Sequence, residues 1–379
     1  MTQHYLDNSA TTCVSEKAAQ TALKIMTQTY GNPSSLHSMG IAAENELEHA
    51  REVIARSIGA DSREIIFTSG GTESNNLALF GAAKAKKRLG NKIVTTSVEH
   101  SSVLEAAKEL EKSGFEVVYL PVDSCGAVSA ESIENAVDGN TILVSVMSVN
   151  NETGAIMPID KIKNIIKRRK SGALFHTDAV QAYGKTPVDV NKIGADLISI
   201  SSHKIHGPKG AGALYIRNKT SFKPITFGGE QERKIRPGTE PLPAICAFAA
   251  AAEEFKIKEN YENALALNRY LQERLSKFSD VVINSHPQKA LPYILNFSVN
   301  GIRSETMLHF LAQNGVYVSS GSACAKGEPS HVLKAMGLKR DLADSAIRIS
   351  LSKHNTVSDI DALVDGIENG IKNLVKRKN

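Results

Sequence analysis

The sequence contains few of the features that mark secreted, membrane-spanning or nucleic-acid-binding proteins. It has no tryptophan and only four cysteines among 379 residues. These cysteines, at positions 13, 125, 246 and 324, lie far apart and form no Cys-x-x-Cys pair. This spacing argues against a disulfide framework and against a zinc or other metal site. Unpaired cysteines fit a reducing, cytoplasmic location.

Long apolar runs and a strong imbalance of charge are also lacking. No apolar stretch reaches the ~18 residues of a membrane-spanning helix, so no membrane contact is expected. The first residues, MTQHYLDNSATT, lack the basic and then apolar pattern of a signal peptide. The net charge is only +5, and the basic residues are dispersed in short clusters, so direct nucleic-acid binding is not expected.

The remaining composition is that of an ordinary globular protein, with 41% hydrophobic and 22% charged residues. The length suggests two or three domains of about 150 residues each. An amphipathic helix is expected over Ile41–Ile58. After it, helical segments alternate with seven strand-like runs, at 64–68, 92–96, 116–120, 141–147, 173–177, 196–200 and 212–216.

This alternation predicts an α/β domain with a mainly parallel, seven-stranded sheet. Two long helices are expected next, over 244–255 and 261–278. The C-terminal third then mixes strands at 291–299, 316–319 and 345–351 with helices at 305–313, 330–336 and 357–376. That pattern is typical of a second, smaller α+β domain.

One lysine stands in an unusual place. Ser202-His203-Lys204 lies on a short polar loop between two apolar runs, Leu197–Ile200 and Ala213–Ile216. Burial lowers the pKa of a lysine and frees its amine, and such an amine can form a Schiff base with a cofactor aldehyde. Taken alone, the commoner interpretation is a lysine that extends to water from a strand end.

Two other motifs follow strands in the same way. Phe67–Glu73 reads as strand, double-glycine turn and helix start at Thr72, which is suited to a phosphate but is also typical of a well-capped helix. Asp178 ends a buried strand, where open α/β sheets place ligand contacts. A carboxylate there needs a cationic partner, and a protonated pyridine nitrogen would serve. An N-cap or ion-pair role is the alternative.

Three further residues are candidates. His100 follows a strand and could stack on a planar ring or act catalytically by shuttling protons, although a lone histidine is more often structural. Cys324 lies in a small-residue loop, Ser319–Pro329, near Lys326, so it is expected to be exposed and nucleophilic, with a helix beginning at Pro329. Arg348 alternates with two isoleucines and is expected to face away from the core, where its guanidinium could bind a carboxylate. An exposed-face arginine is the other interpretation.

Together these motifs resemble those of the pyridoxal-phosphate-dependent cysteine desulfurases of the NifS and IscS type. The similarity covers nearly the whole chain, and the ordered set is far more specific than any single motif. The matching stretches are 5–12, 31–35, 68–76, 98–102, 149–154, 176–181, 201–210, 231–239 and 319–324.

The resemblance implies the fold of type I pyridoxal-phosphate-dependent transferases. Residues 13–260 would form the large cofactor-binding domain, and 1–12 with 261–379 the small domain that carries the cysteine loop. Lys204 would form the covalent bond to the cofactor. Asp178 would pair with the ring nitrogen, Gln181 would contact the ring hydroxyl, and His100 would stack on the ring. The phosphate would be held by Gly71, Thr72, Ser201 and His203, and by Thr239 of a neighbouring subunit, which implies a homodimer.

The resemblance also implies the reaction. Asn151 and Arg348 would bind L-cysteine, and Lys204 would act as the base that removes its α-proton. Cys324 would attack the substrate sulfur, carry it as a persulfide and pass it to an acceptor protein. That acceptor would serve iron–sulfur cluster assembly or the thiolation of tRNA or cofactors.

Some positions depart from the family pattern. Glu230 stands where a third glycine is usual, and Ser352-Lys353 stands where Gly-Arg often occurs. The segment from Cys324 to Pro329 is shorter than in well-known members, which leaves the acceptor open. Two alternatives remain: a selenocysteine lyase or related β-eliminating enzyme, and a non-catalytic binding or regulatory protein with the same fold.

Overall fold

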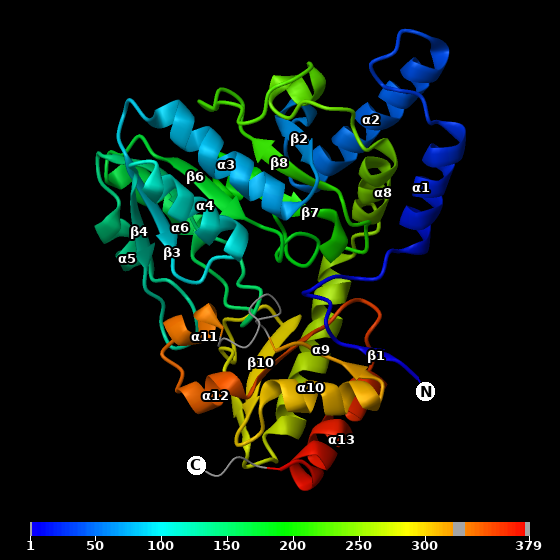
Figure 1. The fold of residues 1–379 in the computed structure, drawn as a ribbon, viewed down its shortest axis with the longest axis vertical. Coiled ribbons are helices and arrows are strands. Elements are labelled where there is room, and N and C mark those ends of the chain that lie inside the picture. Colours follow the sequence, from blue (N-terminus) through cyan, green and yellow to red (C-terminus); the bar gives the residue numbers. More distant parts are fainter. Residues whose placement is uncertain (1, 321–329, 376–379) are drawn as a thin grey trace.

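The computed structural model describes residues 2–320 and 330–375. A seven-stranded sheet with its helices occupies one end of the molecule, and smaller sheets with further helices occupy the other (Figure 1). The large sheet has the order β2-β8-β7-β6-β5-β3-β4. Its strands are β2 (Ile65–Thr68), β3 (Lys92–Thr96), β4 (Glu116–Leu120), β5 (Thr141–Ser145), β6 (Leu174–Asp178), β7 (Leu197–Ser201) and β8 (Gly212–Ile216).

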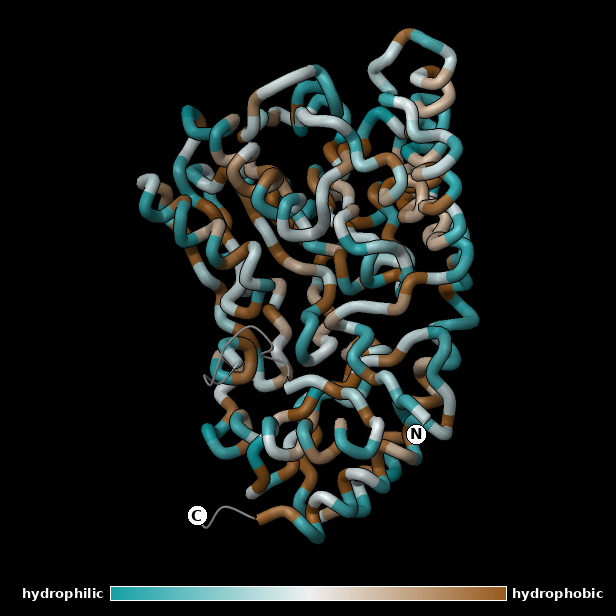
Figure 2. The backbone as a smooth tube through the Cα atoms, turned by 45° about the vertical axis from the view of Figure 1, so that its right-hand side comes forward, coloured by the Kyte–Doolittle hydropathy of each residue, from teal (hydrophilic) through white to brown (hydrophobic). Residues whose placement is uncertain are grey.

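All pairings in this sheet are parallel except the two that β8 makes, with β7 and β2. The prediction of a mainly parallel, seven-stranded sheet is therefore confirmed, with small shifts at some strand ends. Strands β2, β5, β6 and β7 are buried along their whole length because helices cover both faces. Figure 2 follows this pattern, with hydrophobic segments inside and hydrophilic ones along the outer helices.

Two groups of helices flank the large sheet. One face is covered by α3 (Gly71–Lys86) and α4 (Ser101–Lys112). The other face is covered by α5 (Ala130–Ala136), α6 (Ile159–Arg168), the short α7 (Val190–Ile193) and α8 (Leu242–Ala252). Helix α8 is buried almost all round and packs against α1 (Glu16–Gln28) and α2 (Ser38–Ser57). Helix α1 was not predicted, and only two of its side chains, Ala18 and Ile25, are fully buried.

The remaining chain forms a compact α+β assembly. An antiparallel sheet has the order β12-β10-β9, and β1 pairs in parallel with β11. The strands are β1 (His4–Tyr5), β9 (Val281–Ile283), β10 (Ile294–Val299), β11 (Val316–Tyr317) and β12 (Ala346–Ser350). The helices are α9 (Ile257–Leu275), α10 (Ser304–Gln313), α11 (His331–Ala335), α12 (Arg340–Asp344) and α13 (Val357–Asn373).

Two details of the chain bear on the predictions. Helix α11 has Ser330 as its N-cap, whose side chain accepts from two backbone N–H groups, while the predicted start at Pro329 lies outside the described residues. In the described part of the chain, no helix is both long enough and apolar enough to cross a membrane.

A buried ion pair fixes the loop that follows β8. Glu232 accepts two hydrogen bonds from the Arg51 guanidinium, at 2.9 and 2.8 Å, and a third from the backbone N–H of Phe67 at 2.7 Å. Both side chains are almost fully buried. Glu232, Arg233 and Lys234 all have positive φ, which L residues rarely adopt, so the ion pair stabilises a strained segment.

Arg51→Met is expected to lower the free energy of unfolding by about 3–5 kcal/mol, because it leaves the Glu232 carboxylate buried and unpaired. Denaturant unfolding measures the effect. The matched control is Arg63→Met, which breaks the exposed Arg63–Asp61 pair and is expected to lower the free energy of unfolding far less, because solvent screens this pair. Equal losses in the two variants would contradict the assignment.

Candidate active site

The predicted site residues meet at one edge of the large sheet. Strands β3, β5, β6 and β7 run in parallel, so their carboxyl ends lie together, and β2 ends at the same edge because it is also antiparallel to β8. The segments that leave these ends carry the motifs found in the sequence: the double-glycine turn, Glu99-His100, Asn150–Glu152, Asp178 and Ser202–Lys204. The crossover topology thus assembles residues from five separate stretches of the chain.

Lys204 lies in a short 3-10 helix, η2 (Ser202–Lys204), directly after β7. Its Nζ donates hydrogen bonds to the backbone carbonyls of Ser9 and Ala10, the latter at 2.7 Å. The N-terminal segment is held there by further bonds, from Thr12 N–H to the His203 carbonyl and from His206 N–H to Thr12 Oγ1. The interpretation of Lys204 as a lysine extended to water is therefore wrong, since the start of the chain covers it.

Asp178 is buried at the end of β6 and is held by neutral donors. Its two carboxylate oxygens accept from Asn75 Nδ2 at 2.6 Å and from the Val180 N–H at 2.9 Å. Within residues 2–320 and 330–375, no Lys, Arg or His forms an ion pair with it. A buried carboxylate with only neutral partners can still pair with a cationic group, as a protonated ring nitrogen would be.

The double-glycine turn is built for an anion. Gly70 has φ +151°, and a Cβ on Gly71 would lie 2.8 Å from Val180 Cγ2, so side chains are excluded from the turn. No side chain caps the first turn of α3, which leaves its N–H groups for a ligand. The hydroxyl of Ser201 lies beside Gly70, is fully buried, and has no hydrogen-bond partner among the described residues. These features fit a bound phosphate group.

His100 caps helix α4, and its pKa depends on burial and on the charges of other site residues. Its Nδ1 bonds to Ser102 Oγ at 2.8 Å. Burial lowers the pKa of His100, the charge of Asp178 raises it, and the charge of Lys204 lowers it again. Next to it, burial raises the pKa of the Glu99 carboxyl to about 8. Glu99 was not singled out in the sequence, because nothing in the motif distinguishes it from an exposed glutamate.

Arg348 is buried, so the prediction that it faces away from the core and the exposed-face interpretation are both wrong. Every residue of β12 is buried, and the N-terminal segment pairs with the edge of this strand through a β-bridge between Asp7 and Ser350. Arg348 donates to Asp7 Oδ1 at 2.7 Å and to the Asn151 carbonyl at 3.0 Å. Its Nε has no hydrogen-bond partner in the described part of the chain. The guanidinium is therefore fixed, with donor capacity left for a carboxylate.

Other predicted residues fall into three groups. Gln181 is buried and bonds to Ser9 and to Lys185, a residue that the sequence did not point to. Thr72 and Thr239 are exposed, and Thr239 lies in the loop after η3 (Gln231–Lys234). Cys324 and its loop lie outside the described residues.

The three other cysteines, Cys13, Cys125 and Cys246, are free thiols that differ in exposure. Burial in α8 raises the pKa of the Cys246 thiol to about 12, so this thiol stays protonated. Cys13 is exposed and Cys125 is half-buried. In the described ranges, no cluster of three or more His, Cys, Asp or Glu could hold a metal ion.

Comparison with known proteins agrees with this geometry. The family model "Aminotransferase class-V" matches residues 4–363. Cysteine desulfurase IscS of Methanosarcina thermophila is 42% identical over 374 residues, which cover 98% of this chain and 92% of the relative. A solved NifS-like protein superposes with a TM-score of 0.94 at 39% identity, covering 98% and 100% of the two chains. A structure titled "SspA in complex with cysteine" gives a TM-score of 0.82 at 35% identity, covering 94% and 100%.

The fold and the site define a type I pyridoxal-phosphate-dependent enzyme, and the chain belongs to the aminotransferase class-V family. Within that family it is a cysteine desulfurase of the NifS and IscS type, with pyridoxal phosphate as its cofactor.

Proposed function

We propose that this protein removes sulfur from L-cysteine, releases L-alanine and passes the sulfur, carried as a persulfide on Cys324, to an acceptor protein. That acceptor serves iron–sulfur cluster assembly or the thiolation of tRNA or cofactors. The observation that carries the proposal is the shared anchoring of two groups: Asp7 binds Arg348, and Ser9, two residues on, binds Lys204. One short segment therefore holds a carboxylate-binding guanidinium beside a reactive amine.

The residues present fit pyridoxal phosphate. Gly71, Thr72, Ser201 and His203 would hold its phosphate at the α3 turn, Asp178 would pair with its ring nitrogen, and His100 would cover its ring. When bound, the cofactor accepts the electron pair left on Cα after deprotonation. The neutral donors on Asp178 keep its carboxylate oriented for this role.

The protein's own groups bind the substrate and move the proton. Arg348, with Asn151, binds the substrate carboxylate, and burial strengthens this charged hydrogen bond. Lys204 takes the α-proton and later returns a proton to carbon. Its place between the sheet edge and the carbonyls of Ser9 and Ala10 keeps the amine close to the substrate and away from bulk water.

Sulfur transfer falls to Cys324. Its thiolate forms a bond to the substrate sulfur while the carbon–sulfur bond breaks, and carbon keeps the electron pair of that bond. Protonation of this carbon gives alanine, and the sulfur remains on Cys324 as a persulfide. A thiolate on the acceptor protein then takes the terminal sulfur and restores the Cys324 thiolate.

The direct test measures alanine and sulfide from L-cysteine in the presence of a reductant. The wild type is expected to form both products, and Cys324→Ala to lose at least about 10²-fold in rate, because this variant lacks the thiolate that accepts the sulfur. Cys13→Ala, which removes an exposed cysteine, is the matched control and is expected to retain full activity. A fully active Cys324→Ala variant would refute the persulfide role, and activity of that variant on selenocysteine alone would favour a selenocysteine lyase.

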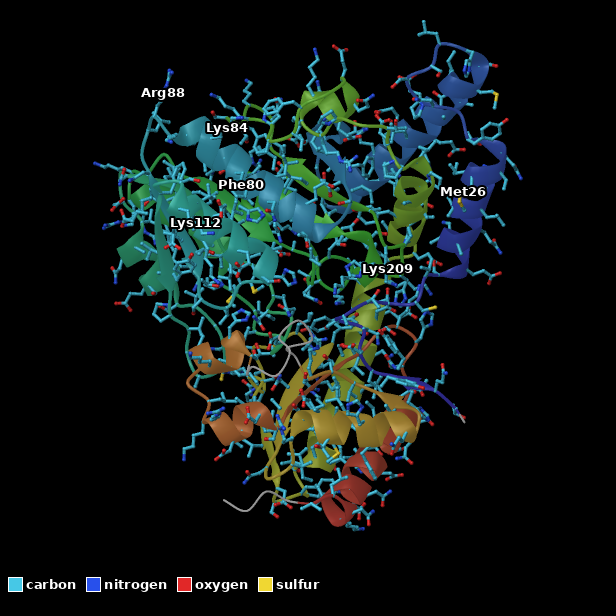
Figure 3. All side chains as sticks on the ribbon, viewed as in Figure 1. Met26, Phe80, Lys84, Arg88, Lys112 and Lys209 are labelled. Atoms are coloured by element: carbon cyan, nitrogen blue, oxygen red, sulfur yellow. The ribbon has the colours of Figure 1, made fainter. Side chains whose placement is uncertain are left out.

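We further infer a homodimer that completes the site. Exposed apolar side chains gather on α1, α2 and their connection, and Met26 projects outward there in Figure 3. Leu36, on this connection, is 96% exposed, which is costly for a monomer. Thr239 is exposed on its loop, as a residue that contacts a neighbouring subunit would be. The apolar group consists of Leu23, Met26, Tyr30, Leu36, Met39 and Ile41.

We also propose that the chain divides into two domains, because each sheet lies within one of the two predicted parts of the chain. Residues 13–260 contain the complete seven-stranded sheet, and residues 1–12 with 261–379 contain all strands of the two smaller sheets. The substrate site then lies where the two parts meet, with Lys204 from one part and Arg348 from the other.

A further inference from the structure

Lys185 is a buried lysine at one end of a hydrogen-bond chain that leads to Lys204. It is 6% exposed, and its Nζ donates to Gln181 Oε1 at 3.0 Å. Gln181 Nε2 in turn donates to the Ser9 carbonyl at 3.1 Å. The same carbonyl accepts a hydrogen bond from Lys204 Nζ. Two groups, the Gln181 amide and the Ser9 carbonyl, therefore connect Lys185 to Lys204.

We propose that Lys185 is a positioning residue that fixes the orientation of the Gln181 amide, so that the NH₂ group of Gln181 is directed to the ring oxygen of the cofactor. This inference rests on the proposed function and extends it to a residue outside the family motifs named above.

The chemistry of the amide supports this role. An amine donates hydrogen bonds to the amide oxygen, whereas the amide NH₂ is a donor only. With Lys185 on one side and a carbonyl acceptor, Ser9, on the other, only one of the two amide orientations satisfies both neighbours. Ser9 engages one hydrogen of the NH₂ group, and the second hydrogen remains for the cofactor. Without Lys185 the amide can rotate and present its oxygen instead.

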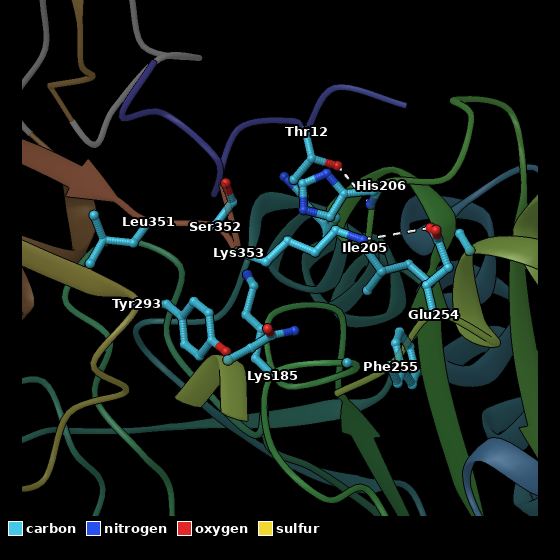
Figure 4. Close-up of a pocket in the computed structure, with 14 residues that line it drawn as sticks. Thr12, Lys185, Ile205, His206, Glu254, Phe255, Tyr293, Leu351, Ser352 and Lys353 are labelled. Carbon is cyan, nitrogen blue, oxygen red and sulfur yellow. Dashed lines mark hydrogen bonds and ion pairs between the residues drawn. The ribbon is translucent and has the colours of Figure 1, made fainter. Parts of the chain in front are cut away.

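The surroundings of Lys185 indicate that it acts through its hydrogen bond and not as a permanent cation. Burial, together with the charges of Lys204 and Arg348, lowers its pKa to about 7. It lines a cavity of about 40 Å³ together with Tyr293 and Lys353 (Figure 4). In the part of the chain that the structure describes, no carboxylate forms an ion pair with it. The titratable and charged groups around it are Lys204, His203, His206, Glu254, Arg348 and Lys353.

A lysine buried at this place would lower the stability of the fold if it had only a structural role. A buried amine without a carboxylate partner costs folding free energy, so replacement by an apolar side chain of similar length is expected to leave the protein folded. Lys185→Met is therefore a usable variant, and thermal unfolding of the cofactor-free protein checks that it folds.

The test is a pH titration of the visible absorbance of the holoenzyme, which reports the proton on the Lys204 nitrogen and does not depend on turnover. The hydrogen bond from Gln181 stabilises the deprotonated ring oxygen and weakens its hold on that proton. Loss of the bond in Lys185→Met is expected to raise the titration midpoint by about one pH unit. Lys353→Met is the matched control, because Lys353 lines the same cavity but pairs with Glu254 at 3.6 Å, and its midpoint is expected to equal that of the wild type.

A double variant shows whether the effect passes through Gln181. Gln181→Leu is expected to raise the midpoint by itself, and adding Lys185→Met to it is expected to change the midpoint little further. Three results would each overturn the inference: an unchanged midpoint in Lys185→Met, an equal shift in Lys353→Met, or additive shifts in the double variant. If the wild type still desulfurates cysteine in that case, the proposed function stands without this inference. A wild type that binds no cofactor would overturn this inference and the proposed function together.

Discussion

Replacing Lys204 by alanine is expected to reduce alanine formation from L-cysteine by about 10²–10⁴-fold or more, because the variant loses its proton-transfer group and its covalent attachment to the cofactor. The Ser9 and Ala10 groups that contact Lys204 Nζ are backbone carbonyls, which only accept hydrogen bonds. Lys185 is separated from the same point by Gln181 and Ser9.

Two measurements define this result. Product assays give the loss of rate, and borohydride reduction followed by peptide mapping locates the covalently attached cofactor. The matched control is Lys209→Ala, since Lys209 is exposed on the loop just beyond Lys204 (Figure 3) and is expected to keep full activity. Cofactor attached to another lysine in the wild type would refute the role of Lys204.

Asp178→Asn is expected to lower kcat/KM by about 10²–10³-fold, because it removes the negative charge that stabilises a protonated ring nitrogen. The fold should tolerate this change. Asn75 Oδ1 is buried and has no partner among the described residues, so rotation of the Asn75 amide turns this oxygen toward the new NH₂ group. The hydroxyl of Ser102, now bonded to Asn75 Nδ2, can then donate to the rotated amide.

The control for this prediction is Asp196→Asn. Asp196 is also a largely buried aspartate, but it lies just before β7, at the opposite edge of the sheet, where it binds Lys163 and the Phe175 N–H. Its replacement is expected to lower stability and to leave kcat/KM of the folded enzyme unchanged. Similar losses of kcat/KM in the two variants would show that a buried negative charge, and not its place beside the cofactor, determines the effect.

The sequence by itself determined the large sheet and the order of the motifs along it. Strands 64–68 through 212–216 are short, apolar and bounded by turn residues, so their local composition suffices to recognise them. Because such strands alternate with helices, their carboxyl ends must share an edge, and this places Lys204, Asp178 and the Gly70-Gly71 turn together. Resemblance to a known family then identified the reaction.

The tertiary structure alone decided what surrounds these residues. The first residues of the chain fold back over the site, where Asp7 and Ser9 bind Arg348 and Lys204. No local sequence pattern predicts such a contact, because its partners are separated by about half the chain or more. For the same reason Arg348 was misplaced: one strand's alternation defines two faces, but only the packed molecule shows that both are buried. The hydrogen bonds from Lys185 to Gln181 and from Gln181 to Ser9 likewise form only in the folded chain, so no sequence pattern pointed to Lys185.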